Sequence, residues 1–277
     1  MKKLFAILLT VVMVLSLCAC SSNSTSDSQS DSGSDSAPDA SGGSDMEYVK
    51  DKGTLVVGIT DFEPMDYKDD NDEWIGFDAD MAKAFAESLG VDVEFVEIDW
   101  DNKIMELEGK TIDCVWNGMT LTDEVTSSME CSNAYCNNGQ VVIVPSDTAD
   151  NYQDTDSLSE LSFAVEAGSA GEKEVAALDL TYTSVKTQAD ALMEVAAGTS
   201  DAAVIDSLMA AAMVGEGTGY DKLTYTCQLN SEEYGVGFRK GSDLAKALND
   251  FFKESFGDGS MTECAEKYGV QAAVIEQ

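Results

Sequence analysis

The chain has 277 residues, of which 52 are acidic and 16 are basic, so its formal net charge is −36. This balance excludes nucleic acid as a partner, because binding it requires clustered lysine and arginine. The chain has one arginine, Arg239, and no histidine. Ser-His-Asp and Cys-His catalysis and histidine-ligated zinc are therefore excluded. We expect no metal site and no cofactor.

The first twenty residues predict a secretory signal that ends on a cysteine. A basic start is followed by a mostly apolar stretch over residues 4–17, which is too short for a confident transmembrane helix. Leu17, Ala19 and Cys20 resemble the lipobox of bacterial lipoproteins. The resemblance implies a signal peptide over 1–20, a lipid on Cys20 and a protein anchored at the extracellular face of the cell membrane. The alternative is an ordinary signal peptide with incidental cysteines.

Residues 21–45 are mostly Ser, Asp and Gly, without an aromatic residue. Such a segment cannot bury enough apolar surface to offset its ordering entropy. We therefore expect a disordered tether that holds a folded part near the membrane.

The remaining chain alternates short apolar stretches with segments of helical periodicity. In its first half we expect a strand over 54–59, a helix over 77–89 with Asp78 or Asp80 as N-cap, and a strand over 91–98. Further strands are expected over 112–116 and 139–144. The second half repeats this order from 161 to 239 and ends with two amphipathic helices. This alternation predicts an α/β fold with mainly parallel strands.

Five cysteines follow the signal, and an odd number leaves at least one thiol without a partner in the same chain. Our preferred bridge joins Cys227 to Cys264, where it would fasten the last helix. A bridge between Cys131 and Cys136 would close only a very small loop.

Several short motifs follow one another in a characteristic order. They are VGITDFEPMDY (57–67), GFDAD (76–80), DCVWNGMTLT (113–122), AVEAGS (164–169), DAAVID (201–206) and YGVGFRKG (234–241). Together they resemble the family 3 extracellular solute-binding proteins, the polar amino acid receptors of ABC importers. The resemblance covers residue 46 to the end of the chain.

The resemblance implies a two-lobed type II periplasmic binding protein fold, with two strands crossing between the lobes. The first lobe would span 46–140 plus 236–277, and the second 141–235. The crossings would fall near 141–144 and 234–238. A monomer would capture an amino acid-like or amine-containing solute between the lobes and deliver it to an ABC permease in the membrane.

The candidate ligand-binding residues follow strands, where the carboxyl end of a strand faces the cleft. In the first lobe Phe62 can stack on a cation, Gly118 lets the backbone approach the ligand, and Thr120 offers a hydroxyl. The first-lobe set is Asp61, Phe62, Trp116, Asn117, Gly118, Met119, Thr120 and Glu124.

In the second lobe, Ser169 and Ala170 open a helix whose free N–H groups attract an anion. Asp206 ends a strand and matches the family's anchor for an α-ammonium group. Glu166 completes the second-lobe set. Helix capping is the structural alternative for Ser169 and for Asp206.

One position departs from the resemblance. Similar proteins carry an arginine that holds the ligand's carboxylate, and here that position is Val125. In one interpretation the ligand still has a carboxylate, which binds backbone N–H groups near Thr120 and Ser169 or a lysine. In the other, the solute is neutral or cationic and faces acidic residues. We favour the second interpretation, with Asp61, Glu124, Glu166 and Asp206 as those acids.

Two other functions fit the same fold. Some dehydratases resemble it and use a carboxylic acid in the cleft as proton donor, a role that Glu166 or Glu124 could fill. A ligand-sensing receptor without transport is the other alternative. We expect a binding protein rather than an enzyme.

Overall fold

The computed structural model describes residues 44–277. The predicted signal peptide with Cys20, and the tether up to residue 43, lie outside these residues. Residues 44 and 45, which the sequence predicts as part of the tether, are folded: Ser44 caps helix α1 (Asp45–Lys52) by accepting a hydrogen bond from the Glu47 N–H. Within 44–277 no helix has the length and apolarity needed to cross a membrane.

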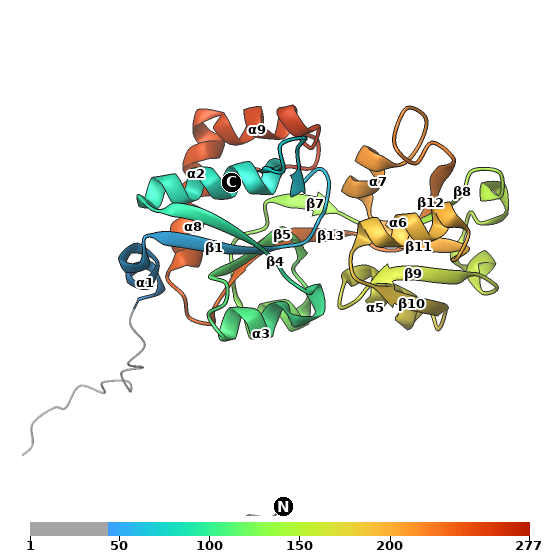
Figure 1. The fold of residues 1–277 in the computed structure, drawn as a ribbon, viewed down its shortest axis with the longest axis horizontal. Helices are drawn as coiled ribbons and strands as arrows, with labels where there is room; N and C mark the ends of the chain where they lie inside the picture. The colour runs from blue at the N-terminus through green and yellow to red at the C-terminus, as the bar shows by residue number, and fades with distance from the viewer. Residues whose placement is uncertain (1–43) are drawn as a thin grey trace, which may run out of the picture. The chain divides into compact units, whose positions relative to one another are not determined.

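The first of two large sheets has the order β4-β1-β5-β13-β6, with β7 paired to β13. Strand β1 is parallel to β4 and β5, whereas β13 is antiparallel to β5. Helices α2 and α9 lie on one side of this sheet and α3 on the other (Figure 1). The strands are β1 (Thr54–Ile59), β4 (Asp92–Glu97), β5 (Cys114–Thr120), β6 (Glu130–Cys131), β7 (Cys136–Asn138) and β13 (Glu232–Phe238). The helices are α2 (Phe77–Leu89), α3 (Lys103–Glu108), α4 (Asp123–Ser128), α8 (Leu244–Asp258) and α9 (Ser260–Tyr268).

The second large sheet has the order β10-β9-β11-β8-β12. Strand β9 is parallel to β10 and β11, while β8 is antiparallel to β11 and β12. The strands are β8 (Gln140–Pro145), β9 (Ser162–Glu166), β10 (Thr181–Val185), β11 (Ala202–Asp206) and β12 (Leu223–Gln228). The helices are α5 (Ala170–Ala177), α6 (Gln188–Ala197) and α7 (Ser207–Met213). A separate hairpin pairs β2 (Tyr67–Lys68) with β3 (Trp74–Ile75).

The chain passes between the sheets twice, at Gly139 and over residues 229–231. Both passages lie just before the crossing segments that the resemblance implied. Segment 141–144 belongs wholly to the second sheet because β8 pairs with β11 and β12, and segment 234–238 belongs to the first because β13 pairs with β5. The described lobes are therefore 44–138 plus 232–277, and 140–228.

Helix α2 begins differently from the expectation that Asp78 or Asp80 caps it. Its N-cap is Gly76, whose φ of 128° favours glycine and where a Cβ would lie 2.1 Å from the Met65 carbonyl oxygen. Asp78 is fully buried and accepts hydrogen bonds from Tyr135 Oη and from Gly118 N, both at 2.7 Å. Asp80 instead pairs with lysines on the surface. Both residues are structural, as expected, but neither caps the helix.

The predicted disulfide between Cys227 and Cys264 is wrong, because both thiols are free. Cys227 lies on β12 and packs against the second-lobe core, whereas Cys264 lies on α9 and packs against the core that includes α2 and α8. A bridge between them would have to join elements of different lobes. Cys131 and Cys136 are also free.

Candidate ligand-binding cleft

A cavity lies between the two lobes, at the carboxyl ends of β5, β9 and β11. Its first-lobe wall consists of Phe62, Trp100, Lys103, Asn117, Gly118, Met119, Thr120, Thr122 and Val125. Its second-lobe wall consists of Glu166, Gly168, Ser169, Ala170, Lys173, Gln188 and Asp206. Lysines contact the facing lobe across the gap: Lys103 Nζ donates to the Gly168 carbonyl at 3.0 Å, and Lys173 Nζ pairs with Glu124 at 2.5 Å.

Most of the residues chosen from the sequence lie on this cavity, and three do not. Asp61 is exposed at the end of β1 and is absent from the lining. Trp116 is buried in the first-lobe core, where its ring meets Phe252 edge-on at 5.6 Å. Glu124 is exposed and takes part in the ion pair that spans the cleft. The side chain of Trp116 is therefore a core element, and the two acids do not line the cavity.

The first-lobe wall is held from behind by buried polar groups. Asn117 accepts from Thr60 N and Oγ1 at 3.0 and 2.9 Å, and its Nδ2 donates to Asp66 Oδ2 at 2.8 Å. The polar atoms of Asn117 are thus already paired within the lobe. Gly118 has a φ of 54°, and a Cβ there would lie 2.5 Å from the Phe62 ring. Asn117 and Gly118 therefore shape the wall and allow Phe62 to lie against it.

Asp206 is held by three amide side chains. Gln140 Nε2 donates to its Oδ1 at 2.8 Å, Asn138 Nδ2 donates to the same oxygen, and Gln188 Nε2 donates to Oδ2. The Asp206 N–H in turn donates to Gln188 Oε1 at 2.8 Å. Burial and the neighbouring Glu232 raise the pKa of Asp206 to about 7, although the hydrogen bonds from Gln188 and Gln140 act to lower it. Asp206 does not cap α7 through its side chain. Its Oδ1 accepts two of these donors and its Oδ2 accepts one, so a ligand could still donate to Oδ2.

Glu166 is buried at the end of β9, beside β11, with 2% of its surface exposed. Its Oε1 has no hydrogen-bond partner within residues 44–277, although the residue lines the cavity. Burial, with Asp206 as the next cause, raises the pKa of Glu166 to about 8. A buried acceptor without a partner is costly, so this oxygen is placed to receive a donor from a ligand.

Lys103 is the main residue of the cavity that the sequence did not reveal. It begins α3, is 8% exposed, and donates to the Trp100 and Gly168 carbonyls at 3.1 and 3.0 Å. Burial lowers the pKa of Lys103 to about 8. No motif marks this lysine in the sequence, because its place in the cleft depends on a contact with the other lobe. Trp100, Thr122, Gly168, Lys173 and Gln188 also line the cavity and were not among the candidates.

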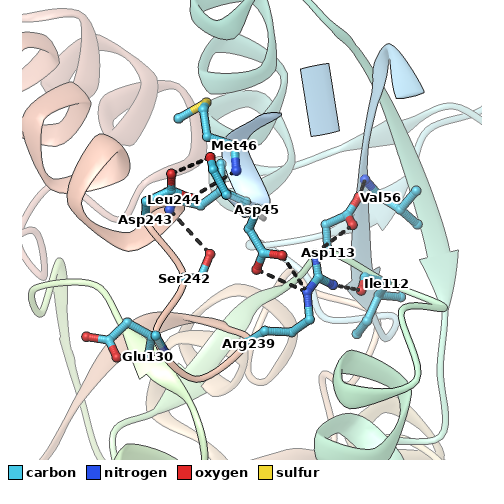
Figure 2. Close-up of polar contacts among 12 residues, drawn as sticks. Asp45, Met46, Val56, Ile112, Asp113, Glu130, Arg239, Ser242, Asp243 and Leu244 are labelled. Atoms are coloured by element: carbon cyan, nitrogen blue, oxygen red, sulfur yellow. Dashed lines mark hydrogen bonds and ion pairs between the residues drawn. The ribbon is translucent and has the colours of Figure 1, made fainter. Parts of the chain in front are cut away.

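The arginine that the resemblance implies is absent from the cavity. Val125 stands at its position, and Arg239 lies elsewhere in the fold. Val125 is buried on α4 and presents only methyl groups to the cavity. Arg239 lies just after β13 and binds Asp45, Asp113 and the Ile112 carbonyl, as Figure 2 shows. It does not line the cavity, so the only arginine of the chain has a structural role.

The residues that line the cleft are not arranged for metal binding. Within residues 44–277 no group of three or more cysteine, aspartate and glutamate side chains could hold an ion. The cavity combines two carboxylates with two lysines, hydroxyl groups and the first turn of α5. Such a set can hold a small charged molecule by both its anionic and its cationic groups.

Comparison with known proteins gives a consistent result. L-cystine-binding protein TcyJ of Escherichia coli (strain K12) is 30% identical over 231 residues, which cover 80% of this chain and 85% of TcyJ. A Gly52Ala mutant of arginine-bound ArgBP from T. maritima has a TM-score of 0.71 and 33% identity, covering 76% of this chain and 99% of that one. The ancestral amino acid-binding protein AncCDT-1, a precursor of cyclohexadienyl dehydratase, has a TM-score of 0.74 and 33% identity, covering 81% and 99%.

The family model for bacterial extracellular solute-binding proteins, family 3, matches residues 55–271. These residues include both sheets, apart from Thr54 at the start of β1, and every residue that lines the cavity. The chain therefore belongs to the bacterial extracellular solute-binding proteins of family 3.

Proposed function

We propose that this protein captures a basic α-amino acid between its lobes and delivers it to an ABC permease, while a lipid on Cys20 anchors it at the extracellular face of the cell membrane. The observation that carries the proposal is the pair of buried acids at neighbouring strand ends. Asp206 is oriented to hold an α-ammonium group, and Glu166 has an oxygen without a partner. Binding without turnover follows the relatives, which are named as binding proteins.

Charge complementarity favours a basic side chain. Two acids, Glu166 and Asp206, face the cavity together with one buried cation, Lys103. The second lysine, Lys173, is paired with Glu124. A basic amino acid carries two cationic groups and one carboxylate, which matches this set. Arginine is the first solute to test, because a related structure has arginine bound.

The test is calorimetric titration with the standard amino acids and with L-citrulline, a neutral analogue of arginine. We expect L-arginine to bind more tightly than L-citrulline, because only the guanidinium is a charged donor for Glu166. In Glu166→Gln, L-arginine should lose about 10- to 100-fold in affinity while L-citrulline changes little. Tight binding of L-glutamate to the wild-type protein would end the basic-solute proposal.

The same titrations separate binding from catalysis. Ligand recovered from the protein by mass spectrometry should be unchanged after long incubation. Conversion of a bound acid to a dehydrated product would favour the dehydratase alternative. A sensing role would be favoured if cells lacking the protein took up the amino acid normally.

The anchor has its own test. In a bacterial expression host that lipidates exported proteins, the wild-type chain should incorporate a labelled fatty acid and sediment with membranes. Cys20→Ser should incorporate none and should appear in the soluble fraction, because the acylated side chain is absent. Cys18→Ser is the matched control and should behave as wild type. Labelling that persists in Cys20→Ser would contradict the proposed anchor.

A further inference from the structure

The cleft contains a buried cation whose role the family resemblance does not supply. Lys103 lies at the start of α3 and is buried, with 8% of its surface exposed. No carboxylate of residues 44–277 lies within ion-pair distance of its ammonium group. A buried charge without a counter-ion is unfavourable. The position therefore calls for an anion.

The geometry around Lys103 Nζ leaves room for one further acceptor. An ammonium group has three N–H donors. Two of them are directed to the Trp100 and Gly168 carbonyls at 3.1 and 3.0 Å. The Trp100 ring lies 4.9 Å from Nζ and helps to fix the side chain. Because Lys103 lines the cavity, its third donor is available to a molecule bound there.

The opposite wall supports an anion at the same place. Gly168, which accepts from Lys103, leads directly into α5, an eight-residue helix. Its first-turn N–H groups, at Ala170 and Gly171, precede the intrahelical hydrogen bonds and carry the positive end of the helix dipole. Within residues 44–277, Ser169 Oγ accepts one hydrogen bond, from the Glu172 N–H. Ala170 lines the cavity with Lys103, so two separate positive groups face one space.

We propose that Lys103 binds the α-carboxylate of the captured amino acid, together with the first turn of α5, and so replaces the arginine that is absent at Val125. The cation has moved from α4 to α3, and Val125 closes the vacated side with methyl groups. Because Lys103 also bridges to Gly168, carboxylate binding and the contact between lobes involve the same ammonium group. This inference rests on the proposed function.

The test compares an amino acid with its carboxamide, because the amide removes the negative charge and keeps the rest of the molecule. We would titrate L-arginine and L-argininamide into the wild-type protein and into Lys103→Met. The wild type should prefer the acid by about 10-fold or more. In Lys103→Met, L-arginine should weaken by about 10- to 100-fold and L-argininamide by less than about threefold, so the preference disappears.

Two further variants make the result decisive. Lys103→Gln keeps donors for the two carbonyls and should also lose the preference. If circular dichroism shows that Lys103→Met is unfolded, Lys103→Gln takes its place in the comparison. Lys246→Met removes an exposed lysine of α8 that does not line the cavity, and it should retain the preference. A purely structural role for Lys103 would weaken acid and amide equally. The α-amino groups of L-arginine and L-argininamide differ in basicity, but this difference is the same for wild type and variant. It therefore cancels when their preferences for the acid are compared.

The outcomes separate this inference from the proposed function. If no amino acid binds the wild-type protein, the proposed function fails and this inference with it. If L-arginine does not bind but L-glutamine does, the basic side chain in the proposed function is overturned, and the same comparison tests Lys103 with L-glutamine and its amide. If an amino acid binds and both Lys103 variants keep the acid preference, the role of Lys103 is overturned while the proposed function stands. If Lys173→Met loses the preference and the Lys103 variants keep it, the other cleft lysine binds the carboxylate and the role of Lys103 is overturned.

Discussion

Replacing Asp206 with asparagine should weaken binding of the amino acid by about 10- to 150-fold, the value of a charge-assisted hydrogen bond in a buried site. The reason lies in the amide cage. Gln140, Asn138 and Gln188 all direct N–H donors at Asp206, so both carboxylate oxygens are oriented before a ligand arrives. Asparagine keeps the shape, removes the charge, and places one NH₂ group against an amide donor of the cage. Calorimetric titration measures the loss directly.

Asp61→Asn is the matched control, because Asp61 was also chosen from the sequence but is exposed and off the cavity. It should change the dissociation constant by less than about threefold, given the small energies of exposed charges. Equal losses in the two variants, or no loss in Asp206→Asn, would contradict the role of Asp206. A thermal melt of each unliganded variant shows whether the fold is intact.

The same site predicts how affinity depends on pH. Burial raises the pKa of Asp206 to about 7 and that of Glu166 to about 8 in the unliganded protein. A cationic ligand requires both acids ionised, so below these values it must displace protons. Affinity should therefore rise from about pH 5 to about pH 8, by up to about tenfold per pH unit for each proton displaced. Deprotonation of Lys103, whose pKa is about 8, should oppose the rise above that value.

The stability of the unliganded protein should change in the opposite direction. Because both acids have raised pKa values when folded, the folded state keeps protons that the unfolded chain has lost above about pH 4. The free energy of unfolding should then fall as the pH rises from about 4 to about 8. Ligand-induced stabilisation should grow over the same interval. In Asp206→Asn both slopes should be smaller, which chemical denaturation at several pH values would show.

Much of the fold could be predicted because its signals are local. Helix α2 has the predicted bounds, 77–89, since its apolar spacing and the left-handed Gly90 at its end are properties of the segment itself. Strand β1 occupies the predicted 54–59 for the same reason. Asp206 could be chosen because it ends a predicted strand and matches the α-ammonium anchor that the family resemblance implies, and Glu166 because it is an acid beside the expected cleft.

The remaining errors concern contacts between distant segments. Lys103 could not be identified, because a lysine at a helix start usually faces solvent and only the packing of the lobes buries it. The sequence predicts Asp78 or Asp80 as the cap of α2, although Asp78 is a buried acceptor for Gly118 and Tyr135. Cys227 and Cys264 were paired without knowledge that they belong to different lobes. Sequence spacing carries no information on such distances.

Arg239→Met should lower the free energy of unfolding by about 3–5 kcal/mol, the cost of removing one partner from a buried charge network. Arg239 Nε lies 3.0 Å from each Asp45 oxygen, Nη1 donates to the Ile112 carbonyl at 2.8 Å, and Nη2 lies 3.2 Å from Asp113 (Figure 2). The Asp113 side chain is fully buried, and its other ionic partner is Lys52. The arginine thus joins α1, the start of β5 and the end of β13.

Urea denaturation would measure this loss, with Lys246→Met as control. Lys246 forms an exposed pair with Asp250 on α8, which should contribute less than about 0.5 kcal/mol. Arg239→Lys should be intermediate, because lysine keeps the charge but not the planar fork that reaches three partners. The dissociation constant of the amino acid should stay within about threefold in every variant, since none of these residues lines the cavity. A large loss of affinity in folded Arg239→Met would contradict the structural role of this residue. It would mean that the arginine affects ligand binding although it does not line the cavity.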